Sequence, residues 1–327
     1  MKELYYHREI PAFVREICET PPMQRLTGVG MNCGCEYTSF PRFRGIGTYS
    51  RYEHSLGTGL IVWHFTQDKV QTTAALLHDI ATPCFAHTID FLNGDYLRQE
   101  STEAKTELFI KGSKELCTVL GKYTIPVEAV TDYHRYPIAD NDSPRLSSDR
   151  LEYTLGNAVR YRICTQMEAE KLYGDIRAGR NEKNCEELVF QNEESAVHFA
   201  EIALKCSKIY VSEEDRYSMQ RLSELMALAL AKGQLTEKEL YSQEKNVISC
   251  LKRDRELSEY WKSFRALHRM ADDESVPEEL RRVIYAKKRY IDPFAAGKGR
   301  ASQINRPFAE KLEEYLLEPQ TKWLYAE

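Results

Sequence analysis

The sequence has no excess of basic residues, and this absence limits the partners that it can bind. It has 327 residues, with 45 Lys and Arg against 50 Asp and Glu, which gives a net charge of -5. We therefore expect no nucleic-acid partner, although a local basic pocket is compatible with this balance. Hydrophobic residues make up 42% of the chain and charged residues 29%, so the composition is that of an ordered globular protein.

Long apolar runs are also missing. The first ten residues, MKELYYHREI, carry charge at once and lack the apolar stretch of a signal peptide. The longest apolar stretches, such as 59–63, are far too short to span a bilayer. The nine cysteines are an odd number and are scattered, which favours reduced thiols. We therefore expect a cytoplasmic protein that has no membrane partner.

The chain has no internal repeat, low-complexity segment or long Gly/Ser linker, and helical periodicity prevails. Glycine and proline cluster at 21–47, which predicts a loop-rich connector. Two short strands around a polar turn are expected at 172–191, as a β-hairpin. The predicted fold is mostly α, with a helical catalytic region at 1–165 and a helical C-terminal region at 166–327 packed on it. The periodicity predicts these helices: 70–80, 194–211, 213–232, 256–269, 277–290 and 307–318.

Histidine is scarce, and three of the eight histidines lie in two short motifs. His54 occurs in RYEHSLGTG, and His78 and His87 occur in ALLHDIATPCFAHTID. Pro83 disfavours helical geometry at the residue before it, so the helix at 70–80 should end just past Asp79. At that point His78 and Asp79 can offer an imidazole nitrogen and a carboxylate oxygen to one divalent metal ion.

Each of these residues also has an ordinary structural interpretation. A single His54 on an amphipathic helix is more often a half-buried packed residue than a ligand. Asp149, in SSDRLEYTL, follows a predicted cap at Ser147 or Ser148 and could be a first-turn acid favoured by the helix dipole. Taken alone, none of these patterns identifies a metal site.

The three motifs RYEHSLGTG, ALLHDIATPCFAHTID and SSDRLEYTL, taken in this order, resemble those of HD-domain metal-dependent phosphohydrolases. The segment before the first motif, PPMQRLTGVGMNCGCEYTSFPRF, is similar to that of the deoxynucleotide triphosphohydrolase-like branch. The similarity covers about the first half of the chain. It implies an HD-type helical core and one divalent metal ion. The ligands that it implies are His54, His78, Asp79 and Asp149.

The resemblance also implies roles for residues near the metal. Arg51, Arg150 and Tyr153 match residues that contact the substrate phosphate or line its pocket; otherwise they would be a surface arginine, a solvated charge and a core aromatic. His87 and Asp90 match polar residues beside the metal, where His87 could position or protonate a phosphate oxygen.

The sequence departs from that branch at two places. Ala81-Thr82-Pro83-Cys84-Phe85 stands where the branch has Gly-His-Pro-Pro-Phe or a similar segment, and Gln99-Glu100 stands where it has a His–Glu pair. Glutamine cannot transfer a proton at neutral pH. Glu100 remains a candidate for proton transfer. We therefore expect slow hydrolysis of deoxynucleoside triphosphates, or a different substrate.

The function expected from the resemblance is hydrolysis of a phosphate ester or anhydride, such as a nucleotide, by metal-activated water. The ligand set suits Mn, Fe, Co, Zn, Ni or Mg and does not select among them. The alternatives are a nucleotidase or phosphodiesterase of the same superfamily and a nucleotide-binding sensor with weakened catalysis. The basic-aromatic cluster KKRYIDP at 287–293 could bind phosphate, although a charged helix end is slightly preferred. A homo-oligomer is left open.

Overall fold

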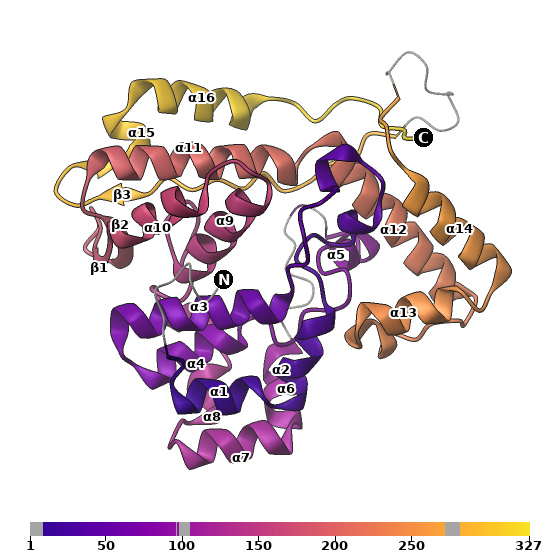
Figure 1. The fold of residues 1–327 in the computed structure, drawn as a ribbon, viewed down its shortest axis with the longest axis horizontal. Helices are drawn as coiled ribbons and strands as arrows, with labels where there is room; N and C mark the ends of the chain where they lie inside the picture. Colours follow the sequence, from indigo (N-terminus) through magenta and orange to yellow (C-terminus); the bar gives the residue numbers. More distant parts are fainter. Residues whose placement is uncertain (1–8, 96, 98–104, 272–281) are drawn as a thin grey trace.

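Helices account for most of the computed structural model, which describes residues 9–95, 97, 105–271 and 282–327 (Figure 1). The mostly helical fold predicted from periodicity is therefore confirmed. No helix within these ranges combines the length and the apolar content needed to cross a bilayer. The first part of the chain forms these helices: α1 (Ala12–Cys18), α2 (Pro21–Arg25), α3 (Arg51–Thr66), α4 (Lys69–Leu77), α5 (Thr88–Leu92), α6 (Thr106–Gly112), α7 (Lys114–Lys122), α8 (Val127–Val130) and α9 (Ser148–Arg160).

Polar caps fix where the three helices that matter for the site begin. Ser50 accepts a hydrogen bond from the backbone of Glu53, whose carboxylate accepts one from the Ser50 backbone, so α3 begins at Arg51. The Asp68 carboxylate caps α4 by accepting from the backbone N–H groups of Val70 and Gln71. Ser147, one of the two caps that the sequence predicted, caps α9. Helix α4 ends at Leu77, so His78 and Asp79 lie in the turn that follows. That end is three residues earlier than expected.

The predicted β-hairpin is confirmed at β1 (Ile176–Arg180) and β2 (Glu186–Phe190), which pair antiparallel. Two further strands, β3 (Phe294–Ala295) and β4 (Gly299–Arg300), extend it to a four-stranded sheet that the sequence did not predict. Strand β3 is parallel to β2, with Phe190 opposite Ala295. The C-terminal part of the chain therefore returns to the hairpin.

Four of the five helices predicted after residue 190 are present, and one is wrong in its described part. Their counterparts are α11 (Glu193–Tyr210), α12 (Glu213–Ala231), α14 (Arg255–Ala266) and α16 (Arg306–Leu317); the sequence did not predict α10 (Gln166–Gly174), α13 (Glu244–Leu251) or α15 (Ala301–Ile304). Residues 282–290 of the helix expected at 277–290 are extended, whereas 272–281 lie outside the described residues. Ile284 and Ala286 are buried and Tyr285 between them is exposed, which is the alternation of an extended chain.

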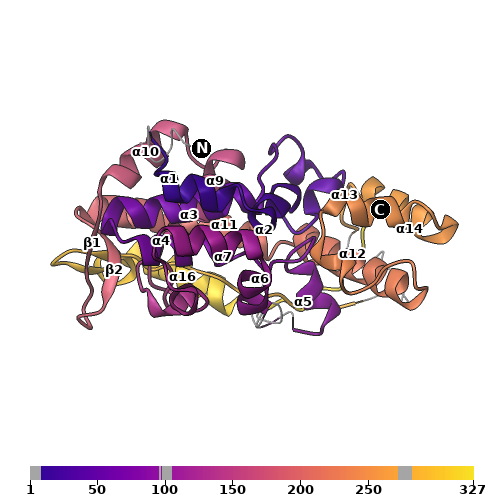
Figure 2. The same cartoon turned by 90° about the horizontal axis from the view of Figure 1, so that it is seen from below.

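Four hydrophobic clusters hold the helices together, and α3 contributes to two of them. Leu60 packs among α1, α2, α4 and α7. Ile61 and Val62 belong to a second cluster, which contains residues of α9 and of the strands β1 and β2. The latter cluster includes Phe190 and Phe199, so it spans the expected boundary between 165 and 166. The expected connector at 21–47 contains α2 and three single 3-10 turns. In Figure 2 the sheet lies at one end of the molecule and α12–α14 at the other.

Candidate metal centre and substrate site

Three of the four expected metal ligands form one tight group between α3, α4 and α9. His54 Nε2 lies 3.1 Å from His78 Nε2 and 3.0 Å from Asp149 Oδ1, and His78 Nε2 lies 3.4 Å from the same oxygen. Their donor atoms all lie within 4.8 Å of one another. His54 comes from the first turn of α3, His78 from the end of α4 and Asp149 from the first turn of α9. The helix starts and stops described above therefore bring the ligands together.

The opposite side of each imidazole is occupied by a hydrogen-bond acceptor. His78 Nδ1 lies 2.7 Å from the Ala75 carbonyl oxygen, so Nδ1 carries a proton. His54 Nδ1 contacts Oε2 of Glu152, which also accepts a hydrogen bond from the Tyr49 hydroxyl. In the neutral rings the Nε2 lone pairs of both histidines then point at each other and at Asp149.

Three converging lone pairs repel one another unless a cation lies between them, so these residues fit a divalent metal ion. Burial disfavours charge on His54, but the carboxylates of Glu152 and Asp149 outweigh it and raise the His54 pKa to about 10. Without a metal ion, a proton therefore occupies Nε2 of His54 and faces Asp149, and a metal ion would replace that proton. Burial also opposes the charge of Asp149, yet the two histidines keep its pKa well below the usual range. Two nitrogens and a carboxylate oxygen suit several divalent metals.

Asp79, the fourth expected ligand, lies at the edge of this group. Its Oδ2 is 3.5 Å from His78 Nε2 and 3.7 Å from His54 Nε2. Arg51 Nη1 donates to the same oxygen at 2.7 Å, and the Thr82 hydroxyl donates to Oδ1 at 2.8 Å. Burial opposes the charge, but Arg51 and the histidines lower the Asp79 pKa below its usual range. Thr82, which stands where the triphosphohydrolase-like branch has a histidine, thus orients a candidate ligand.

Close approach of α3 and α9 allows Glu152 to reach His54. A Cβ atom on Gly57 of α3 would lie 2.7 Å from Glu152 Cγ, so only glycine leaves room for this side chain. Glu152 has no exposed surface. Neither Glu152 nor Tyr49 was predicted from the sequence. The available signal was that Glu152 lies three residues after Asp149 on one helix, so both can face α3.

His87 and Asp90, both expected beside the metal, are in contact with each other. His87 Nδ1 lies 2.9 Å from Asp90 Oδ2, and Nε2 lies 3.4 Å from Nη2 of Arg289. Burial, and to a smaller extent the charges of Arg289 and Arg51, lower the His87 pKa, against the opposing effect of Asp90. His87 is therefore neutral at pH 7, with Nε2 as a proton acceptor. Glu100 and Gln99 lie outside the described residues.

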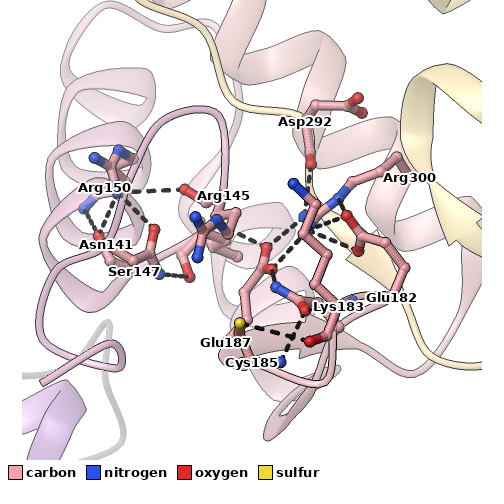
Figure 3. A network of polar contacts seen from close by, with 12 residues as sticks. Asn141, Arg145, Ser147, Arg150, Glu182, Lys183, Cys185, Glu187, Asp292 and Arg300 are labelled. Carbon is pink, nitrogen blue, oxygen red and sulfur yellow. Dashed lines mark hydrogen bonds and ion pairs between the residues drawn. The ribbon is translucent and has the colours of Figure 1, made fainter.

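Within the described residues, Arg150 makes its hydrogen bonds and its ion pair with the loop that precedes α9. Its Nη1 lies 3.0 Å from Asp140 Oδ1 and donates to Asn141 Oδ1 at 2.9 Å and Ser147 Oγ at 3.2 Å (Figure 3). These contacts favour a structural role, in which Arg150 fixes the loop before α9. Tyr153, one turn after Asp149, packs against Tyr210 with ring centroids 6.3 Å apart. Burial raises its pKa to about 12, and it lies in the fields of Arg150, Asp149 and Arg289.

Two curated proteins resemble parts of this sequence. The metal-dependent phosphohydrolase cns2 of Cordyceps militaris is 26% identical over 200 residues, which are 61% of this chain and 54% of cns2. The uncharacterized protein YdhJ of Bacillus subtilis is 22% identical over 253 residues, 76% of this chain and 74% of YdhJ. The chain therefore spans about half the length of cns2. No family model matches the sequence.

Solved structures show the same fold. A hypothetical protein from Aquifex aeolicus superimposes with a TM-score of 0.62 at 20% identity, over 94% of this chain and 91% of that one. A phosphohydrolase from Bacteroides thetaiotaomicron gives a TM-score of 0.54 at 14% identity, over 83% of this chain and 78% of that one. At these identities the comparison establishes the arrangement of the helices.

Proposed function

We propose that this protein is a metal-dependent phosphohydrolase of the HD type that acts on a phosphate ester or anhydride. The convergence of His54 Nε2, His78 Nε2 and Asp149 Oδ1 carries the proposal. The Nδ1 atom of each ring is hydrogen-bonded to an acceptor, so each Nε2 is left to bind a metal ion. Asp79 is the fourth ligand in this proposal. Similarity to cns2, whose name describes a metal-dependent phosphohydrolase, supports the same class.

The proposed reaction consumes one water molecule. The bond between phosphorus and the leaving oxygen breaks, a bond from phosphorus to the water oxygen forms, and the leaving oxygen receives a proton. A bound divalent metal supplies a Lewis acid that polarises the phosphoryl oxygen and lowers the pKa of water. Neutral His87 can accept a proton at Nε2, whereas protonating a phosphate oxygen would require its imidazolium form.

Arg51 has two parts in this proposal. Its Nη1 holds Asp79 in position, and its buried Nε has no hydrogen-bond acceptor among the described residues. That atom has almost no accessible surface, so the phosphate contact that the motif resemblance implies for Arg51 would use another N–H group of its guanidinium. A nucleotide substrate is the finer proposal, and it rests on the resemblance of the motifs.

Metal analysis of the purified protein, followed by a phosphate-release screen, tests this function. We expect one divalent metal per chain and metal-dependent release from at least one phosphate compound, with both lost in Asp149→Ala. Glu170→Ala, a change at a partly exposed position on α10, should keep both. Absence of turnover by metal-loaded protein that still binds a nucleotide tightly would overturn the enzyme assignment in favour of a sensor.

The departure at Gln99 can be tested on its own. If the site has drifted from the triphosphohydrolase branch, Gln99→His should increase hydrolysis of deoxynucleoside triphosphates and leave monophosphates unchanged. The comparison requires equal metal content in both proteins. Rapid hydrolysis of triphosphates by the unmodified protein, unaffected by the substitution, would show that the absent histidine is not needed.

A further inference from the structure

An arginine from the C-terminal part of the chain reaches the candidate site. Arg289 lies in the extended segment 282–293, which runs from beside α12 to β3, and its Nη2 is 3.4 Å from His87 Nε2. The charges of Arg289 and of Asp149 both act on the Tyr153 phenol. Arg289 therefore lies on the side of the site formed by His87 and Tyr153, far in sequence from the metal motifs.

The backbone on both sides of Arg289 is fixed by hydrogen bonds. Gln320 accepts from the Ala286 backbone at 2.7 Å and donates to its carbonyl at 3.1 Å. The hydroxyl of buried Tyr315 donates to the Arg289 carbonyl at 3.2 Å. The Asp292 backbone donates to the Pro144 carbonyl at 2.9 Å, in the loop that leads to α9. A long side chain on a fixed backbone loses less conformational freedom when it binds a ligand.

A buried ionic network fastens the end of this segment to the hairpin. Arg300 contacts both carboxylate oxygens of Glu187 and donates to the Asp292 carbonyl at 3.1 Å (Figure 3). Glu187 also accepts from the Leu146 backbone at 3.0 Å. The loop before Asp149 and the segment that carries Arg289 are thus held by the same side chains. The position of Arg289 relative to the metal ligands is set by the fold.

Arg150, to which the motif resemblance gives a phosphate contact, is held by Asp140. Arg289 lies beside the candidate site, with its Nη2 3.4 Å from Nε2 of His87. A guanidinium at this place can turn its planar N–H groups toward the oxygens of a phosphate.

We propose that Arg289 binds an anionic phosphate group of the substrate, so that the C-terminal segment supplies a binding residue to a metal site built by the first half of the chain. This inference rests on the proposed phosphohydrolase function. It assigns to Arg289 the phosphate contact that the motif resemblance gives to Arg150. The ligand class is a phosphate monoester or anhydride, whose oxygens lie beside His87.

Binding of inorganic phosphate to the metal-loaded protein tests this proposal by calorimetry. We expect Arg289→Gln to weaken phosphate binding at least tenfold with unchanged metal content, and Arg289→Lys to weaken it less. Arg282→Gln removes an arginine from the same segment at its contact with Glu224, and it should bind phosphate like the unmodified protein. On any compound that is hydrolysed, Arg289→Gln should raise KM more than it lowers kcat.

The outcomes separate this inference from the proposed function. Equal phosphate affinity in Arg289→Gln and the unmodified protein, or no phosphate binding by the unmodified protein, overturns the role of Arg289. If phosphate binds through Arg289 but no phosphate compound is hydrolysed, the binding role stands and the enzymatic function fails. Equal thermal melting of Arg289→Gln and Arg282→Gln guards against a folding defect.

Discussion

The contact between Glu152 and His54 shows how one buried carboxylate can set the chemistry of a candidate ligand. By accepting from Nδ1, Glu152 leaves Nε2 of His54 as the lone pair that faces His78 and Asp149. Tyr49 donates to the same carboxylate oxygen, which restrains the side chain. Partners of this kind orient a ligand and increase its basicity without touching the metal.

Replacing Glu152 by Gln should weaken metal binding about 10–100-fold, because partners behind a ligating histidine typically contribute that much. Titration of Co²⁺ into metal-free protein, followed by its visible absorption, measures the change and reports altered ligand geometry. Glu152→Asp should recover part of the affinity. Unchanged affinity and spectrum in Glu152→Gln would show that the carboxylate only fills space.

The pH dependence of hydrolysis should reflect the lowered pKa of His87. A histidine with a lowered pKa keeps its neutral, proton-accepting form from pH 8 down to below its usual value of about 6.5. We therefore expect kcat/KM to be flat between pH 7 and 8 and to fall only below about pH 6.5. His87→Ala should lose roughly 10²–10⁴-fold activity and abolish this acidic limb. A decline that begins above pH 7 would contradict the assignment.

At the residue scale, the short motifs named three residues that the structure brings together. His54, His78 and Asp149 converge because each lies at the beginning or end of a helix. Glu152 was missed because its contact is with His54, another side chain of the group. The cluster at 287–293, which contains Arg289, was considered for phosphate binding, but a charged helix end was preferred, and its contact with His87 depends on tertiary packing.

The crossing of α3 and α9 is the element-level feature on which the site depends. Gly57→Ala should destabilise the protein by roughly 1–3 kcal/mol, because the added methyl group would overlap the immobile Glu152 side chain. Gly121→Ala on α7 is the matched control. Nothing lies within 4 Å of its Cβ position, so there alanine should stabilise by up to about 1 kcal/mol. Urea unfolding measures both, and equal effects would contradict the close approach.

The anchoring of the hairpin to the C-terminal segment gives a second test at this scale. Glu187 is fully buried against Arg300, so Glu187→Gln should cost about 3–5 kcal/mol of unfolding free energy by leaving a buried cation poorly paired. Glu182 also pairs with Arg300 but is partly exposed, and Glu182→Gln should cost less than about 1 kcal/mol. Equal decreases in unfolding free energy for the two variants, measured with denaturant, would show that the buried pair at Glu187 stabilises the protein no more than the exposed one.

Elements with strong local signals were predicted, and those defined by distant contacts were not. The hairpin at 172–191 was evident from its alternation and polar turn. Strands β3 and β4 are two residues each and exist because β2 offers an edge. Residues 282–290 carry helix-forming residues, yet they are held extended by hydrogen bonds that Arg216 donates to the Ile284 carbonyl and that Gln320 exchanges with the Ala286 backbone. Tertiary contacts here outweigh a helix propensity of a few tenths of a kcal/mol per residue.

At the scale of the whole molecule, we expect one cooperative unfolding transition. The cluster that contains Ile61, Leu155 and Phe199 joins the expected catalytic region to the C-terminal region, so neither can lose its packing alone. Scanning calorimetry should give equal calorimetric and van't Hoff enthalpies for the metal-free protein. Two resolved transitions would instead support regions that unfold independently.

The return of the C-terminal segment to the hairpin has a consequence for synthesis on the ribosome. The candidate metal ligands have all been made once Asp149 is added, but Arg289 and β3 follow after an interval on the order of ten seconds at typical elongation rates. During that interval Glu187 lacks Arg300, and the outer edge of β2 lacks its parallel neighbour. The growing chain therefore holds its metal-binding motifs before it holds the arginine proposed to bind substrate. The proposed substrate face is therefore completed only after Arg289 has been added to the chain.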